Sequence, residues 1–206
     1  MRINTAQDLQ RGAEVLIALE PAFAPVLAAV GPLPLRRRAD GFGALVSAIV
    51  GQQVSTASAA AILGRLEAAG FCDADTVKAT PDQALLACGL SRPKLRYIRG
   101  LAEAQLDYAA LRSAPSDEVV TTLVALPGIG RWTAEIYAKF ALGHADVFAA
   151  GDLALQEAAR RLFDLPVRPS EKQMRALSAP WSPVRAVAAR ALWAYYRLET
   201  DREGAL

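Results

Sequence analysis

The chain has 206 residues and a formal net charge of +2, which is the size of one domain or of two lobes that share a core. Hydrophobic residues make up 53% and charged residues 21%, so the chain can bury a core and is not of the disordered class. No apolar run reaches the roughly 18 residues that cross a bilayer, and the first residues form no signal region. Two cysteines and one histidine are too few for a disulfide framework, an iron–sulfur cluster or a multi-histidine zinc site. These features predict a soluble, cytoplasmic protein.

The charge balance permits binding to a polyanion without requiring it. Arginine, whose planar guanidinium suits phosphate oxygens, far outnumbers lysine along the chain. The same richness in arginine and alanine is also typical of proteins from GC-rich genomes. Composition alone therefore gives only weak support to a nucleic-acid partner.

Apolar residues recur at helical spacing along nearly the whole chain. In chain order, this pattern and the capping signals predict helices over 45–50 and 60–66, one that begins at Thr80-Pro81-Asp82-Gln83, then 119–126, one after Gly130, 156–163, one capped by Ser170 with Gln173, and 184–198. No hairpin dipeptide lies between alternating apolar runs, so strands are not expected. The predicted fold class is all-α, with about ten short helices.

The helices are predicted to form two helical lobes of a single module, residues 1–206. Residues 40–150 would form the central lobe, with a helical hairpin at 119–142, and residues 1–39 and 151–206 would pack as the second lobe. A groove between two helical lobes is a natural ligand site, so we expect the active-site cleft there.

The segment from Leu126 to Ala134 reads LPGIGRWTA and separates two predicted helices. Glycines at 128 and 130 allow unusual backbone dihedrals and close approach of another chain. The amides that follow such a turn point outward at a helix N-terminus, where the dipole favours an anion. A DNA phosphate is a natural partner, with Arg131 and Thr133 adding side-chain contacts. A plain turn between packed helices remains an equal alternative, because short glycine patterns are poorly specific.

Asp152 precedes another predicted helix. Its ordinary role would be an N-cap, worth about 1 kcal/mol. Its chemical role would be a carboxylate that stabilises a sugar acquiring positive charge as its bond to a base breaks. Capping aspartates greatly outnumber catalytic ones, so the spacing alone leaves both roles open.

Four motifs in order carry a resemblance. The run from Leu126 to Gln156 reads LPGIGRWTAEIYAKFALGHADVFAAGDLALQ, and it is preceded by LVSAIVGQQVS at 45–55 and GLSRPKLRYI at 89–98, and followed by WSPVR at 181–185 with ALW at 191–193. Together they resemble the 3-methyladenine DNA glycosylase II family, the alkylated-base branch of the helix-hairpin-helix glycosylase superfamily. The resemblance covers residues 40–198. It implies two helical lobes with a helix-hairpin-helix motif, and the short N-terminus leaves no room for the β domain of some relatives.

The resemblance assigns roles residue by residue. Asp152 occupies the position of the catalytic aspartate. Gln53 stands where the family places the residue that wedges into the duplex as the damaged nucleotide flips out, and Gln52 beside it is the alternative. Trp132 replaces the lysine that forms a Schiff base in lyase-competent relatives, which implies a monofunctional enzyme.

The remaining site residues follow from the same resemblance. The hairpin, through Gly128, Gly130, Arg131 and Thr133, would grip the phosphate backbone. The base pocket would be lined by Trp132, Leu153, Ile136 and Val184, of which Ile136 and Val184 stand where some relatives carry aromatic rings. A monovalent cation, sodium or potassium, would be held by the backbone carbonyls of Val124, Leu126 and Ile129. No cofactor would be required for catalysis, and no iron–sulfur cluster is expected.

The function that the resemblance implies is hydrolysis of the N-glycosidic bond of alkylated bases, chiefly 3-methyladenine and also 7-methylguanine or other N-methylated bases. The partner would be double-stranded DNA, the product an abasic site, and the enzyme a monomer associated with the nucleoid if bacterial. The alternatives are a non-catalytic DNA-binding scaffold and a glycosylase for other damaged bases. Among the residues without an assigned site role, Trp193 is expected to pack in the core, His144 to lie on a loop surface, and Arg185 and Arg190 to lie on solvated helix faces.

Overall fold

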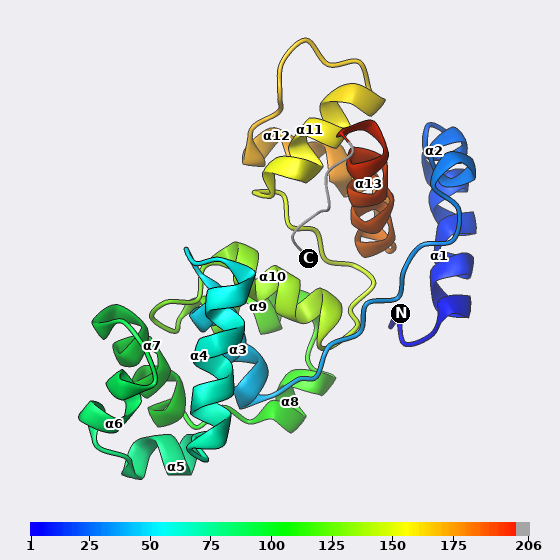
Figure 1. Cartoon of the computed structure of the whole chain (residues 1–206). Coiled ribbons are helices and arrows are strands. Elements are labelled where there is room, and N and C mark those ends of the chain that lie inside the picture. Colours follow the sequence, from blue (N-terminus) through cyan, green and yellow to red (C-terminus); the bar gives the residue numbers. More distant parts are fainter. Residues whose placement is uncertain (201–206) are drawn as a thin grey trace. The chain divides into compact units, whose positions relative to one another are not determined.

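The computed structural model describes residues 1–200, which fold into helices joined by short turns (Figure 1). The helices are α1 (Ala6–Leu19), α2 (Phe23–Val30), α3 (Phe42–Gly51), α4 (Thr56–Ala68), α5 (Ala74–Ala79), α6 (Asp82–Ala87), α7 (Arg92–Glu103), α8 (Tyr108–Ser113), α9 (Ser116–Val124), α10 (Arg131–Phe140), α11 (Leu153–Leu162), α12 (Glu171–Ser178), the 3-10 helix η1 (Ala179–Trp181) and α13 (Arg185–Thr200). Within residues 1–200 the extended pairing is limited to an isolated bridge between Arg2 and His144. The all-α prediction is confirmed.

The helices divide into two compact units. The first consists of Met1–Arg37 together with the chain from Ala138 onward, and the second is the continuous segment Arg38–Tyr137. The sequence placed residues 138–150 in the central lobe, whereas they cluster with the terminal segments. The reason is aromatic packing, because Phe140 stacks on Trp193 of α13 and Phe148 meets the ring of Trp181 edge-on.

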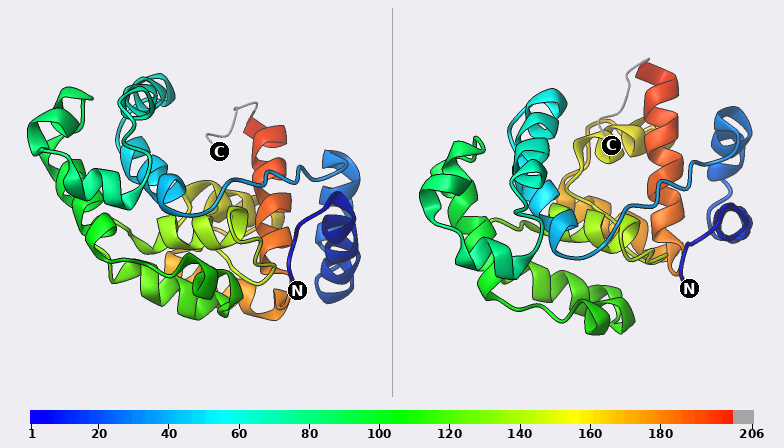
Figure 2. Two further views of the ribbon diagram at one scale, coloured as in Figure 1. Left: turned by 90° about the horizontal axis from the view of Figure 1, so that it is seen from below. Right: turned by 60° about the horizontal axis from the view of Figure 1, so that its bottom comes forward.

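In the first unit, α13 packs against α1 and α2 and also against α11 (Figure 1). Both views of Figure 2 show α1 and α2 running beside α13. The segment of α13 from Ala186 to Trp193 is buried. Its small alanines let neighbouring helices approach closely. Gly12 of α1 fits this contact, since a Cβ built there would lie 2.7 Å from Cγ2 of Val187.

A second apolar cluster of this unit surrounds Trp181, which is 1% exposed. Its ring meets Phe23 edge-on at a centroid distance of 5.2 Å and stacks on Phe163 at 5.9 Å. Aromatic contacts of this geometry add to the free energy of burying the rings. The cluster therefore joins α2 and the end of α11 to the segment before α13.

In the second unit, α7 packs against α3, α5 and α6. Its apolar face buries Leu95, Ile98 and Leu101, and the side chain of Ser91 caps its first turn by accepting the amide of Lys94. The ammonium of Lys94 in turn donates to the carbonyl of Val50 at 2.7 Å, near the end of α3.

Two helix starts show how well capping signals predicted the elements. Ser170 and Gln173 form the predicted capping box at the start of α12. The box predicted at Thr80 is wrong, because α6 begins without a side-chain cap. The hydroxyl of Thr80 instead donates to the carbonyl of Thr76 at the end of α5.

Candidate active site

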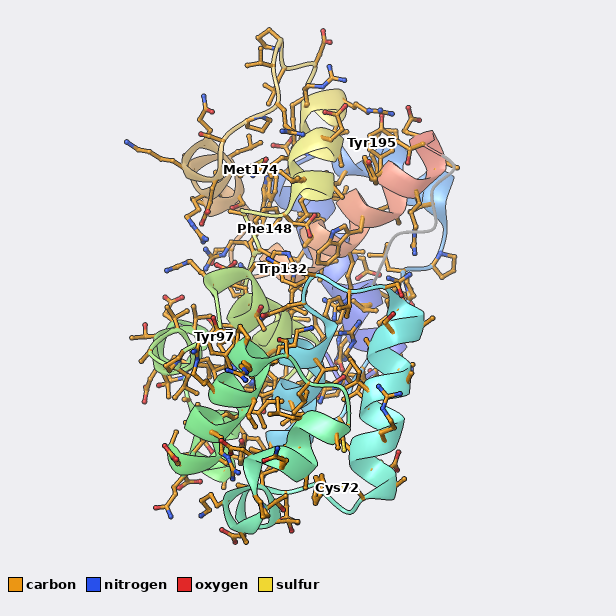
Figure 3. The ribbon with its side chains drawn as sticks, turned by 60° about the vertical axis from the view of Figure 1, so that its left-hand side comes forward. Cys72, Tyr97, Trp132, Phe148, Met174 and Tyr195 are labelled. Carbon is orange, nitrogen blue, oxygen red and sulfur yellow. The ribbon has the colours of Figure 1, made fainter. Side chains whose placement is uncertain are left out.

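The turn between α9 and α10 has one glycine that needs its conformational freedom. Gly128 adopts φ +85°, and a Cβ at that position would collide with the ring of Tyr97 on α7 (Figure 3). Gly130 has no positive φ, and a Cβ there would meet nothing within 4 Å. The two glycines of the motif therefore serve different ends: the first makes the turn, and the second leaves the backbone open at the start of α10.

The side chain of Gln52 supports this turn from the end of α3. Its Nε2 donates to the carbonyl of Gly128 at 2.9 Å. Gln52 and the turn line an open concavity of about 560 Å³, together with Tyr97, Val124, Ala125, Leu126, Pro127, Ile129, Gly130 and Thr133. Gln53 is different, because its side chain is exposed and its backbone has φ +55°. The side chain of Gln52 is thus hydrogen-bonded within the unit, and the side chain of Gln53 is exposed to solvent.

The first turn of α10 contains the other predicted phosphate ligands. The Arg131 side chain is 56% exposed and its Nε lies 3.2 Å from Oε1 of Glu135. Thr133 is 8% exposed and Trp132 is 42% exposed, with Trp132 labelled at the start of this helix in Figure 3. Arg131 and Trp132 are therefore available to a ligand, whereas Thr133 is buried where it lines the concavity.

The carbonyls predicted to hold a cation lie in the same turn. The carbonyl of Leu126 accepts the amide of Ile129 at 3.1 Å, which closes a tight turn. A carbonyl oxygen has a second lone pair available to a cation. Val124 is the last residue of α9, and the cation on the carbonyls of Val124, Leu126 and Ile129 stays a prediction.

Asp152 is the N-cap of α11. Its Oδ1 accepts the amides of Ala154 and Leu155, each at 3.0 Å. The same oxygen accepts the indole N–H of Trp193 at 3.2 Å. Two backbone amides at a helix start and one indole thus converge on one carboxylate oxygen and fix its orientation.

The loop that leads to Asp152 is held at both ends. The side-chain amide of Gln156 donates to the carbonyl of Ala150 at 2.9 Å. Asp146 binds Arg185 at the start of α13, with Oδ1 2.6 Å from Nε and Oδ2 3.0 Å from Nη2. Arg185 therefore anchors this loop, which differs from the expected solvated position.

Trp193 was expected to be a packing residue, and the structure adds a polar role. It is 7% exposed, and its ring stacks on Phe140 at a centroid distance of 5.9 Å. The ammonium of Lys139 lies 4.2 Å from the Trp193 ring centroid, and the Lys139 side chain is fully buried. Sequence reasoning overlooked Lys139, although a single charged residue between apolar neighbours in the run IYAKFAL is a signal that it could have used.

The predicted base-pocket residues differ in accessibility. Leu153, directly after Asp152, is 61% exposed, whereas Ile136 is 6% exposed and Val184 is fully buried. Leu153 and Trp132 are thus the members of that set with surface open to a ligand. Arg190, expected on a solvated face, is 3% exposed and lies over the ring of Phe140.

Comparison with known proteins decides the family. A family model described as "HhH-GPD superfamily base excision DNA repair protein" matches residues 46–183. The chain belongs to this family.

Within residues 1–200, no helix is both long enough and apolar enough to cross a membrane.

Two relatives of this HhH-GPD protein have names that refer to a DNA glycosidase or to DNA repair. The alkylbase DNA glycosidase-like protein mag2 of Schizosaccharomyces pombe is 26% identical over 198 residues, which cover 90% of this chain and 93% of the relative. A probable bifunctional transcriptional activator/DNA repair enzyme AlkA of Mycobacterium tuberculosis is 36% identical over 93% of this chain, which spans 41% of that longer protein.

Solved structures show the same fold. A DNA-3-methyladenine glycosidase from Bacillus halodurans superposes with a TM-score of 0.85 at 29% identity, covering 98% of this chain and 94% of the other. The 3-methyladenine DNA glycosylase Mag1 of Schizosaccharomyces pombe, in complex with abasic DNA, gives a TM-score of 0.74 at 24% identity, covering 94% and 99%.

Proposed function

We propose that this protein is a DNA glycosylase of base excision repair that hydrolyses the N-glycosidic bond of alkylated bases in double-stranded DNA and leaves an abasic site. Its substrates are 3-methyladenine and, beside it, 7-methylguanine and other N-methylated bases. The family membership supports the repair role, and the names of the relatives support the alkylated substrate. It acts as a monomer in the cytoplasm, at the nucleoid in a bacterial source.

The observation that carries this proposal is the set of donors on Asp152. A base methylated at a ring nitrogen already has positive charge, so its glycosidic bond is weakened before the enzyme acts. The enzyme then has to stabilise the sugar as it becomes oxocarbenium-like. A carboxylate oriented by two backbone amides and an indole N–H can do this and can orient the attacking water. The cationic base leaves without a strong general acid.

The hairpin supplies the proposed grip on DNA. The open backbone at Gly130 and the exposed guanidinium of Arg131 suit a phosphate at the start of α10. Because Gln52 is engaged with the turn and Gln53 is exposed, we assign the wedge role to Gln53. Gln52 then supports the turn that binds the backbone.

The proposed base contacts come from the accessible residues Trp132 and Leu153. An indole face attracts a cationic base by roughly 0.5–2 kcal/mol. Trp132 lacks the amine needed for a Schiff base, so the enzyme is proposed to be monofunctional. A sodium or potassium ion on the carbonyls of Val124, Leu126 and Ile129 would neutralise part of the phosphate charge at the hairpin and takes no part in bond breaking.

Single-turnover excision from a duplex with one alkylated base tests the proposal. Wild type should release the base, and Asp152→Asn should lose release by several orders of magnitude while still binding the duplex. Asp164→Asn is the matched control, because it removes the same charge from an exposed position of the same unit and should excise normally. Borohydride should trap no covalent DNA adduct.

Failure to release any base from a panel of methylated duplexes, despite tight binding, would overturn the proposal in favour of a DNA-binding scaffold. Release by Asp152→Asn at the wild-type rate would leave Asp152 only its capping role. A trapped covalent adduct would replace the monofunctional assignment with a glycosylase that also has lyase activity.

A further inference from the structure

A buried lysine lies behind the indole that bonds to Asp152. Lys139, in the last turn of α10, is fully buried, and its Nζ lies 4.2 Å from the centroid of the Trp193 ring. The edge of that ring carries the N–H that Asp152 accepts at 3.2 Å. One aromatic ring thus has a cation on its face and an anion at its N–H.

The two contacts on Trp193 act in the same direction. A cation over an indole is attracted to its π-electrons and draws electron density away from the N–H, which makes that group a better donor. Hydrogen bonds polarise one another in this way when they are joined in a chain inside a protein. The donor–acceptor distance of 3.2 Å is longer than the roughly 2.7–2.9 Å of a strong charge-assisted bond, so donor strength and ring orientation both matter here.

A second buried cation lies beside the same aromatic pair without touching Trp193's face. The guanidinium of Arg190 lies 4.8 Å from the centroid of Phe140, the ring that stacks on Trp193. Its Nη1 donates to the carbonyl of Ala186, while Nε and Nη2 have no hydrogen-bond partner among residues 1–200. Arg190 therefore provides a control for the removal of a buried positive charge from this cluster.

We propose that Lys139 is a positioning residue for the excision reaction: its ammonium fixes and polarises the indole of Trp193, which holds Oδ1 of Asp152 in place. This inference rests on the proposed function and adds a residue that acts through Trp193. The role requires a cation on the ring face. Arginine at 139 should preserve it in part, because a guanidinium also stacks on indole, and methionine, which fills similar space without charge, should not.

The kinetic test compares four proteins on one alkylated duplex: wild type, Lys139→Met, Lys139→Arg and Arg190→Met. Single-turnover rates at saturating enzyme should fall about tenfold in Lys139→Met, the order seen when a group that orients a functional residue is removed. Lys139→Arg should recover most of the rate, and Arg190→Met should stay within about twofold of wild type. The dissociation constant for an abasic duplex should be unchanged in all four.

The spectroscopic test follows the indole N–H directly. The chain has three tryptophans, so a ¹⁵N-tryptophan sample gives three indole signals, and Trp193→Phe identifies the relevant one. Lys139→Met and Asp152→Asn should both move that proton signal upfield, and Arg190→Met should move it much less. This measurement needs no substrate, so it separates this inference from the proposed function if no alkylated base is released.

An unchanged Trp193 signal with an unchanged rate in Lys139→Met would overturn the proposal. So would an equal loss of rate in Arg190→Met, or a Lys139→Arg variant as slow as Lys139→Met, because either result would indicate that Lys139 only fills space. If Lys139→Met does not fold, Lys139→Gln takes its place and is judged by the same signals.

Discussion

The side-chain amide of Gln52 donates to the carbonyl of Gly128 at 2.9 Å and so ties the end of α3 to the turn before α10. The neighbouring residue Gln53 is exposed and has no such bond among the contacts of residues 1–200. Adjacent glutamines in one motif therefore have separable tasks, and each can be removed alone.

Gln52→Ala should lower the free energy of unfolding by about 1 kcal/mol, the worth of one hydrogen bond to a part-buried carbonyl, and weaken binding to undamaged duplex. Gln53→Ala should leave stability within about 0.5 kcal/mol and binding to undamaged duplex nearly intact, but slow single-turnover excision. Urea unfolding measures the stability of both variants, and fluorescence anisotropy measures their affinity for undamaged duplex. Equal excision rates in Gln53→Ala and wild type would remove the wedge assignment.

The glycines of the hairpin should respond differently to the same added methyl group. Gly128→Ala should lose about 2 kcal/mol or more of stability, because a side chain at positive φ is strained by about 1–2 kcal/mol and the Tyr97 ring occupies the space. Gly130→Ala should be neutral or slightly stabilising, yet bind DNA less tightly if a phosphate approaches that backbone. Thermal unfolding gives the first comparison and anisotropy the second. Unchanged affinity in Gly130→Ala would place the phosphate elsewhere.

Two replacements of Asp152 should separate its structural role from its chemical role. Asparagine is as good an N-cap as aspartate, so Asp152→Asn should stay within about 0.5 kcal/mol of wild type in stability, whereas Asp152→Ala should lose about 1–2 kcal/mol. Both should be inactive in excision. A calorimetric melting curve for each variant tests this, and similar melting temperatures for Asn and Ala would show that the cap contributes little.

His144 should make the protein less stable in mild acid. Burial, then the charges of Arg2 and the N-terminus, lower the His144 pKa to about 4, below the roughly 6.5 of an unfolded chain. Between these values the unfolded state binds more protons, so the free energy of unfolding decreases as pH falls from 6.5 toward 4. The loss by pH 4 should be about 3 kcal/mol. Urea midpoints across this range measure it.

His144→Leu is the control for this pH dependence. It removes the titrating ring, whose buried Nε2 has no hydrogen-bond partner in the described part of the chain, and should flatten the stability profile between pH 6.5 and 4. A slope as steep as that of wild type would assign the acid sensitivity to carboxylates instead.

The helical fold, the hairpin and the capping role of Asp152 could be predicted because each depends on local signals. Apolar spacing determines which face of a helix is buried, and glycine or aspartate at a helix end has a local reason to be there. Gln53 and the ring of Trp132 are exposed, and the roles that the family motif suggested for them stay predictions.

The contacts around Asp152 could not be predicted, because they join segments far apart in sequence. Trp193 is 41 positions from Asp152, and no pattern in either segment indicates that the indole N–H will meet the carboxylate. The burial of His144 and Arg190 has the same origin. His144 lies in a short loop and Arg190 is a lone charge among apolar residues, and the packing of the first unit removes both from solvent.

The arrangement of the two units has a consequence for how the chain emerges from a ribosome. The unit Arg38–Tyr137 is continuous and can fold once its last residue is synthesised, whereas α1 and α2 of the other unit need α13, which comes last. At ordinary elongation speeds, the time between the synthesis of α2 and the synthesis of α13 is on the order of ten seconds. During it the apolar faces of two finished helices have no final partner, so the nascent chain is most open to chaperone capture while its first thirty or so residues await its last helix.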